Sequence, residues 1–154
     1  MRIPIVLLLA ALAAPLAMQA AKPTIAFVGL RHSHCWRQLE NAKTQAHAIE
    51  LVGIAESIPS LVAEAKKVHP DQYYADDYKQ LVKERKPDIV WAFVENNRHL
   101  EILEHMAPLG IHVIFEKPLA SSYAEAKRMK DLATKHNVQV MTNYQMAWWP
   151  TNQE

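Results

Sequence analysis

Residues 24–34 read TIAFVGLRHSH and open the alternation of strands and helices along the chain. The first five residues are apolar or β-branched, as expected of a strand that is covered on both faces. Gly29 follows directly, where a strand can turn tightly into a helix because glycine accepts positive φ. A helix is then expected from Ser33 or His34 to Ala46, with apolar residues at helical spacing. The stretch therefore predicts a strand–turn–helix unit at the start of the domain.

The same alternation of strand and helix continues to residue 141. Further strands are expected at residues 50–55, 72–75, 88–94, 111–115 and 138–141. The helices between them are expected to begin at Pro59, after a cap at Asp76 or Asp77, near Arg98, and after a capping box of Ser122 and Glu125. This order predicts an α/β domain over residues 22–143 with a doubly wound parallel sheet, strand order 3-2-1-4-5-6.

The first 21 residues have a different character. Arg2 gives a positive start, residues 5–14 are an unbroken apolar run, and small residues follow Pro15. This layout is typical of a cleaved secretory signal peptide, and the apolar run is shorter than the roughly 20 residues that span a bilayer. No twin-arginine pair is present, so a Sec-like route to the periplasm or the exterior is expected. A retained membrane anchor and a misplaced start codon are the alternatives.

Charge and cysteine content exclude some partners. The formal net charge is +1, and no basic cluster indicates nucleic-acid binding. Cys35 is the single cysteine, so an intrachain disulfide is impossible. His32, His34 and Cys35 lie close together in the chain, but no second cluster stands at the spacing of a zinc site. No metal is expected, and Ser33 is expected to cap the helix.

The turn after the first strand matches a dinucleotide-binding loop in part. Gly29 stands where such a loop needs its first glycine, whereas Arg31 and His34 occupy the places of the second and third. Arg31 obstructs a close approach of the pyrophosphate unless its guanidinium turns toward the phosphates. The helix N-terminus still supplies amide donors for an anion.

Glu56 comes just after the second strand, 27 residues beyond Gly29. An acidic residue there hydrogen-bonds the adenosine ribose and repels a 2′-phosphate, which favours NAD over NADP. The alternative is a surface acid beside a helix start at Ser57.

Glu116, Lys117 and Pro118 follow the fifth predicted strand at once. Ligands of open parallel sheets bind at the carboxyl ends of the strands, so Lys117 is expected to project into the cleft. There it could bond a substrate hydroxyl and help it lose a proton.

These motifs and their spacing resemble the glucose-fructose oxidoreductase / inositol dehydrogenase / rhizopine-catabolism (Gfo/Idh/MocA) family. The resemblance runs from Ile25 to Asn143 and is carried by the stretches IAFVG (25–29), ELVGIAE (50–56), NNRHLE (96–101) and GIHVIFEKPLA (110–120). It implies a Rossmann domain that binds NAD(P), and hydride transfer at a sugar or cyclitol hydroxyl. The residues assigned to the cofactor site are Gly29, Arg31, His32, Glu56, Asn96, His99, Glu116 and Lys117, with Lys117 also catalytic.

The resemblance also implies a second domain, which usually supplies a catalytic Asp and His. Residues 144–154 are expected to begin a linker to that substrate domain. Trp148 and Trp149 are expected either to cover the cofactor or substrate or to pack against the second domain. Homo-oligomers could form through the second domain. The leading hypothesis is an exported oxidoreductase of which this fragment alone is inactive. The alternative is a Rossmann-fold binding or scaffold protein without redox turnover, since two of the three glycines are missing.

Overall fold

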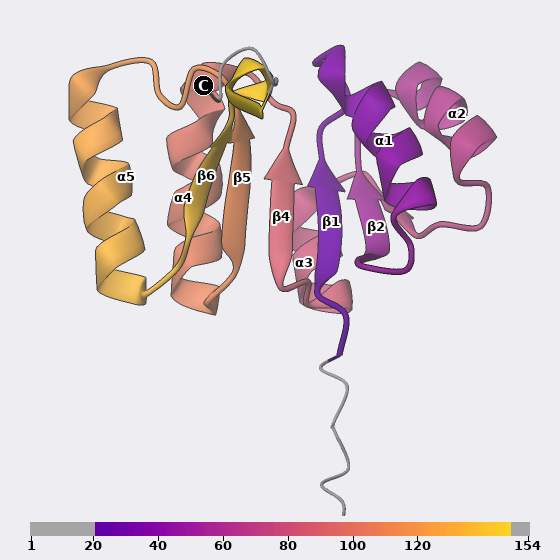
Figure 1. The fold of residues 1–154 in the computed structure, drawn as a ribbon, viewed down its shortest axis with the longest axis horizontal. Helices are drawn as coiled ribbons and strands as arrows, with labels where there is room; N and C mark the ends of the chain where they lie inside the picture. Colours follow the sequence, from indigo (N-terminus) through magenta and orange to yellow (C-terminus); the bar gives the residue numbers. More distant parts are fainter. Residues whose placement is uncertain (1–20, 149–154) are drawn as a thin grey trace, which may run out of the picture.

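Six parallel strands form one sheet in the order β3-β2-β1-β4-β5-β6 (Figure 1). This computed structural model describes residues 21–148. The strands are β1 (Thr24–Val28), β2 (Glu50–Ala55), β3 (Tyr74–Ala75), β4 (Ile89–Ala92), β5 (His112–Glu116) and β6 (Val140–Asn143). The predicted doubly wound topology is therefore confirmed.

Five α-helices connect the strands. They are α1 (His34–Thr44), α2 (Pro59–Val68), α3 (Tyr78–Arg85), α4 (His99–Met106) and α5 (Tyr123–His136). Short 3-10 helices, Asn96–Arg98, Ala107–Leu109 and Gln145–Trp148, complete the described part. No helix in residues 21–148 is both long enough and apolar enough to cross a membrane. The predicted signal peptide lies outside the described residues, apart from Ala21.

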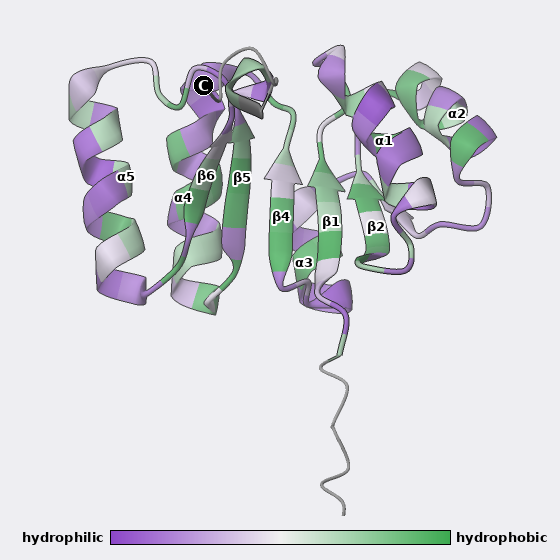
Figure 2. Ribbon diagram, in the orientation of Figure 1, coloured by the Kyte–Doolittle hydropathy of each residue, from purple (hydrophilic) through white to green (hydrophobic). Residues whose placement is uncertain are grey.

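The helices divide between the two faces of the sheet. One core joins the sheet to α3, α4 and α5, through buried side chains such as Leu81, Ile102 and Met129. The other joins it to α1 and α2, through Leu39 and Ala65. Strands dominated by hydrophobic residues lie between helices of mixed character (Figure 2). Burial on both faces explains why the strands lack the apolar–polar alternation of a sheet with one wet face.

On the α1–α2 face, one row of side chains crosses the sheet and grows more exposed along it. Consecutive strand pairings align Ile54, Phe27, Trp91, Ile114 and Met141. Ile54 and Phe27 are buried under the helices, Trp91 and Ile114 are half-buried, and Met141 is 56% exposed. The β5–β6 half of this face is therefore uncovered in the described part of the chain.

Element ends differ from the predicted bounds in a systematic way. The last two strands run one or two residues further toward the C-terminus than predicted, so Glu116 and Asn143 end strands instead of following them. The predicted strand 88–94 ends at Ala92, and α1 ends at Thr44 instead of Ala46. α4 ends at Met106, and Pro108 lies in the following 3-10 turn, which ends at Gly110 with φ +74°.

Helix caps were predicted correctly in two places and wrongly in one. The Asp77 carboxylate accepts from Lys79 N at the start of α3, and Ser122 accepts from Glu125 N at the start of α5. Ser33 stands at the N-cap of α1, but its side chain makes no capping hydrogen bond.

Candidate functional site

The turn after β1 depends on Gly29. Its φ is +80°, and a Cβ there would lie 2.9 Å from Val94 Cγ1 and 3.1 Å from the Phe93 carbonyl oxygen. Its N–H donates to the Ala55 carbonyl at 2.8 Å, so the turn is held between the ends of β2 and β4. An L-residue would meet both strain and overlap here, which confirms the reason for a glycine at this position.

Glu56 is held between two loops by backbone hydrogen bonds. One carboxylate oxygen accepts from Leu30 N at 2.7 Å, and the other accepts from Ile58 N at 2.9 Å. The residue is only 6% exposed. The alternative of a surface acid beside a helix start at Ser57 is therefore wrong, and α2 begins at Pro59 instead. A carboxylate oxygen can accept more than one hydrogen bond, so both retain capacity for a ligand hydroxyl.

Gly29 and Glu56 line the same cavity, at the carboxyl ends of β1, β2 and β4. Its volume is about 210 Å³. Six further polar or charged residues that the sequence analysis did not assign also line it: Ser57, Asp76, Asp77, Tyr78, Glu95 and Arg98. They follow β2, β3 and β4, so the rule that ligands bind at carboxyl strand ends could have found them.

Arg31 lines this cavity too, but it does not point freely toward it. Its guanidinium forms an ion pair with Glu95 at 2.6 Å, and its side chain is 64% exposed. In this arrangement the group that replaces the second glycine is held by the loop after β4. Ion pairs this exposed are weak, so a ligand phosphate could compete for the guanidinium.

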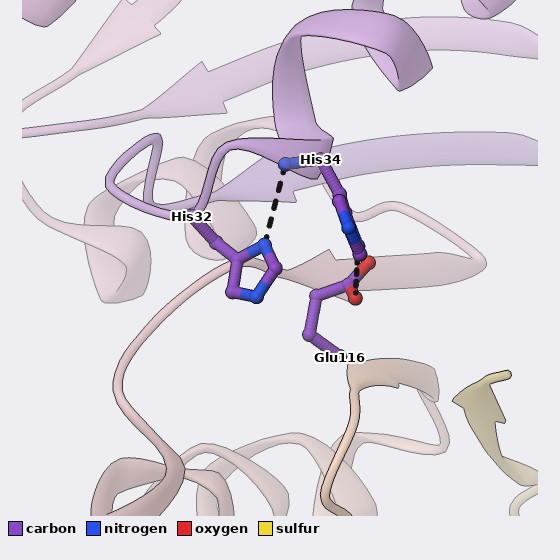
Figure 3. A group of neighbouring side chains, drawn as sticks. All are labelled: His32, His34 and Glu116. Carbon is purple, nitrogen blue, oxygen red and sulfur yellow. Dashed lines mark hydrogen bonds and ion pairs between the residues drawn. The ribbon is translucent and has the colours of Figure 1, made fainter. Parts of the chain in front are cut away.

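A second polar cluster lies beyond the cavity, where α1 approaches the end of β5 (Figure 3). His34 Nδ1 lies 2.9 Å from a Glu116 carboxylate oxygen. His32 Nδ1 accepts from the His34 backbone N–H at 3.3 Å, so His32 does the capping that was predicted for Ser33. The two imidazole rings meet edge to face, with centroids 4.6 Å apart.

Glu116 is fully buried within this cluster. Its second carboxylate oxygen accepts from Asn143 Nδ2 at 2.6 Å, across the β5–β6 pair. Neither His34 nor Asn143 was assigned to the site from the sequence. His34 occupies the place of the third glycine of the loop, and Asn143 lies beyond the predicted end of its strand.

Lys117 lies beside the cluster and does not line the cavity. Its side chain is exposed at the end of β5. Burial lowers the pKa of His32 below 6.5, and the positive charge of Lys117 adds to that effect, while the Glu116 charge opposes it. Lys117 is thus close enough to influence the imidazole electrostatically. Its assignment as a catalytic residue stays a prediction.

His99 and Asn96 occupy different environments. His99 is fully buried, its Nδ1 lies 3.0 Å from the Leu119 carbonyl oxygen, and its ring stacks on Phe115. Burial also lowers its pKa. The ring holds the segment that follows Lys117 and offers no surface to a ligand in this structure. Asn96 is half-buried at the start of the 3-10 helix before α4. Their assignment to the cofactor site stays a prediction.

The site therefore has two parts along the carboxyl edge of the sheet. The residues around Gly29 and Glu56 fit the adenosine half of a dinucleotide, because they combine a close-packed turn, a hollow and a ribose-competent carboxylate. The residues around Glu116 and Lys117 lie over β5, where polar and titratable groups gather. This fold and this edge define a dinucleotide-binding α/β domain.

Comparison with known families makes the assignment specific. Residues 24–144 match the family model described as an oxidoreductase family with an NAD-binding Rossmann fold, Gfo/Idh/MocA. The chain belongs to this family, as the motifs predicted.

Relatives of known name include the levoglucosan dehydrogenase of Pseudarthrobacter phenanthrenivorans, 30% identical over 113 residues. That alignment covers 73% of this chain and 29% of the relative. The chain thus spans less than a third of the length of this curated relative.

Two solved structures resemble the fold at 20% identity. The WlbA dehydrogenase of Bordetella pertussis, a complex with NADH and UDP-GlcNAcA, gives a TM-score of 0.78 over 86% of this chain and 40% of that one. The scyllo-inositol dehydrogenase of Lactobacillus casei, with bound NAD(H) and scyllo-inositol, gives 0.76 over 85% and 38%.

Proposed function

We propose that this domain binds NAD across the carboxyl edge of its sheet, and that it serves an oxidoreductase acting on a CH–OH group of a sugar or cyclitol. One observation carries the proposal: the buried Glu56 carboxylate lies against the Gly29 turn on a shared cavity. The family model and the ligands named for the two dehydrogenase structures support it.

Glu56 and Gly29 would hold the adenosine half. The Glu56 carboxylate would accept from the ribose hydroxyls, and it would repel a phosphate at the 2′ position. Asp76 and Asp77 line the same cavity and add negative charge. This charge distribution favours NAD over NADP.

Lys117 would act at the other half of the cleft. Bound NAD would supply the hydride acceptor, whereas the protein would position the substrate and manage its proton. An ammonium group beside a substrate hydroxyl can donate a hydrogen bond to the oxygen and stabilise the alkoxide character that develops there. Lys117 is exposed and therefore free to reach such a hydroxyl.

We further propose that a substrate domain completes this cleft. Met141 is exposed on the uncovered β5–β6 half of the α1–α2 face, and Tyr144 and Met146, in the segment after β6, are exposed as well. A packed second domain would remove them from water. The apolar row from Ile54 to Met141 would then be covered along its whole length.

Substitution of Lys117 separates an enzyme from a scaffold. In the protein extended by its substrate domain, Lys117→Ala should lower kcat by roughly 10²–10⁴-fold, the usual contribution of an acid–base group. NAD affinity should change little, because the contribution belongs to the transition state. Lys130→Ala, at an exposed position of α5, is the control. Turnover is measured with a panel of sugars and cyclitols.

The second candidate function is a binding or scaffold protein without redox turnover. Arg31 and His34 favour it, because both add bulk where the family's loop carries glycine. Absence of turnover in the extended wild type, together with absence of NAD binding, would establish this alternative.

Export is proposed from the first 21 residues alone. The mature protein should begin at Ala21 or Lys22, and N-terminal sequencing of protein recovered from the periplasm or medium tests this. Met1 intact on cytoplasmic protein would contradict it.

A further inference from the structure

We propose that His32, His34 and Glu116 form a binding site for one divalent transition-metal ion, with Zn²⁺ as the representative. One ligand atom from each of the three residues can be chosen so that all lie within 4.8 Å of one another. None of the three residues lines the cavity at Gly29 and Glu56, but His32 and Glu116 also belong to the predicted cofactor site, so the metal site borders the nicotinamide half and is tested without NAD. It departs from the expectation, based on chain spacing alone, that this domain binds no metal.

The donor set suits such an ion. Two imidazole nitrogens and one carboxylate oxygen are the protein ligands of many catalytic zinc sites. The same set of three ligands binds iron in many non-haem iron oxygenases. Three protein ligands leave at least one position open for water or a ligand oxygen. His32 and His34, whose rings lie beside Glu116 in Figure 3, are half-buried, so the cluster is reachable from solvent.

Geometry brings two of the donors almost into place. His34 Nδ1 and the Glu116 oxygen are 2.9 Å apart, and donors around one zinc ion at about 2.0–2.1 Å are separated by only slightly more. The ion would replace the hydrogen that these two atoms share. His32 lies two residues before His34, and a change of its side-chain rotamer can bring a ring nitrogen closer.

The charge of the buried Glu116 carboxylate gives an independent reason to expect a bound cation. Glu116 is fully buried, and burial of an ionised carboxylate is unfavourable unless a positive charge or several hydrogen bonds compensate it. Its partners are His34 and the amide of Asn143, and no ion pair joins it to a lysine or arginine in residues 21–148. A bound divalent cation would supply the missing charge.

Asn143 would orient the carboxylate ligand. Its side-chain amide donates to the Glu116 oxygen that does not face His34. Such partners fix the direction of a metal ligand and commonly change metal affinity when they are removed. The four residues come from the loop before α1, from α1, and from the ends of β5 and β6, so the folded sheet assembles the site.

Calorimetric titration tests this directly. The 154-residue chain is freed of metal with a chelator and titrated with ZnCl₂ in the absence of NAD. We expect saturable binding of one ion per chain. His34→Ala and Glu116→Gln should each weaken it about 100-fold, and Asn143→Ala about 10-fold. His47→Ala, which removes an exposed histidine outside the cluster, should leave it unchanged.

If a variant fails to fold, X-ray absorption of the zinc-loaded wild type still tests which residues bind the ion. The spectrum should show two imidazoles and one carboxylate oxygen at about 2.0–2.1 Å. Absence of saturable binding, a ligand shell without two imidazoles, or full affinity in folded His34→Ala would each overturn the proposal.

Discussion

At the residue scale, position 29 requires glycine for two separable reasons. Its backbone is left-handed, and there is no space for a Cβ. Gly29→Ala should lower the free energy of unfolding by about 3 kcal/mol, because an L-residue costs about 1–2 kcal/mol in this conformation and overlap adds about 1–3. The overlap would involve Val94 and Phe93.

Gly110 provides the matched control. It has a similar φ, +74°, but nothing lies within 4 Å of an added Cβ. Gly110→Ala should therefore cost only about 1–2 kcal/mol. Denaturant unfolding measures both, and equal losses would show that close packing at Gly29 contributes nothing.

His99 should make stability depend on pH. Burial holds the pKa of the folded imidazole below 6.5, whereas the unfolded imidazole returns to about 6.5. Between the two values the unfolded chain binds more protons, so the free energy of unfolding falls as the pH drops below about 6.5. Denaturant midpoints at about pH 7.5 and 5.5 measure this.

His99→Gln should reduce the difference in the free energy of unfolding between about pH 7.5 and pH 5.5. It should not abolish it, because the pKa of His32 is lowered in the same direction. His47→Gln, at an exposed position, is the control. An unchanged pH dependence in His99→Gln would remove His99 as a source.

Single residues also show where sequence reasoning succeeds. Gly29 and Glu56 could be placed because their roles depend on position relative to a strand end. His34 and Asn143 could not, because their contact with Glu116 joins residues 82 and 27 positions away in the chain. The glycine pattern of the loop indicates that His34 stands where a glycine is expected. It does not indicate that the imidazole reaches Glu116.

At the element scale, hydrophobic runs and helical spacing predicted every strand and α-helix of the described residues, but not the 3-10 helices, and errors concentrate at element ends. Apolar residues continue past β4 at Phe93 and Val94, since the chain stays buried after the ladder ends. The polar ends of β5 and β6 were missed for the converse reason. Glu116 and Asn143 pair within the sheet although their side chains are polar.

The capping box of α5 gives a test at this scale. Ser122→Ala should destabilise the protein by about 1 kcal/mol, because Ser122 Oγ accepts from the Glu125 N–H. Ser121→Ala should cost little, because Ser121 meets the Glu125 carboxylate through its backbone N–H. Thermal or denaturant unfolding compares the two. Equal losses would place the contribution elsewhere than in the cap.

At the scale of the whole molecule, topology brings the functional residues to one edge. Residues from the loops after β1, β2, β3 and β4 surround the cavity, whereas Glu116 and Asn143 at the ends of β5 and β6 meet His32 and His34 from the start of α1. Strand order was predictable from the alternation of elements. The division of the edge into two parts was not, because it depends on where side chains such as Arg31 and His34 turn.

Glu56 and the Gly29 turn are proposed to hold the adenosine half of NAD. Calorimetric titration of the 154-residue chain with NAD and with NADP measures this. NAD should bind at least about tenfold more tightly, because a carboxylate opposes a 2′-phosphate. Glu56→Gln should reduce that preference even if loss of one of the two backbone hydrogen bonds, from Leu30 or from Ile58, weakens the binding of both nucleotides. Glu50→Gln, at the far, exposed end of β2, should preserve it. No binding of either nucleotide, or equal affinities that Glu56→Gln leaves unchanged, would contradict the account.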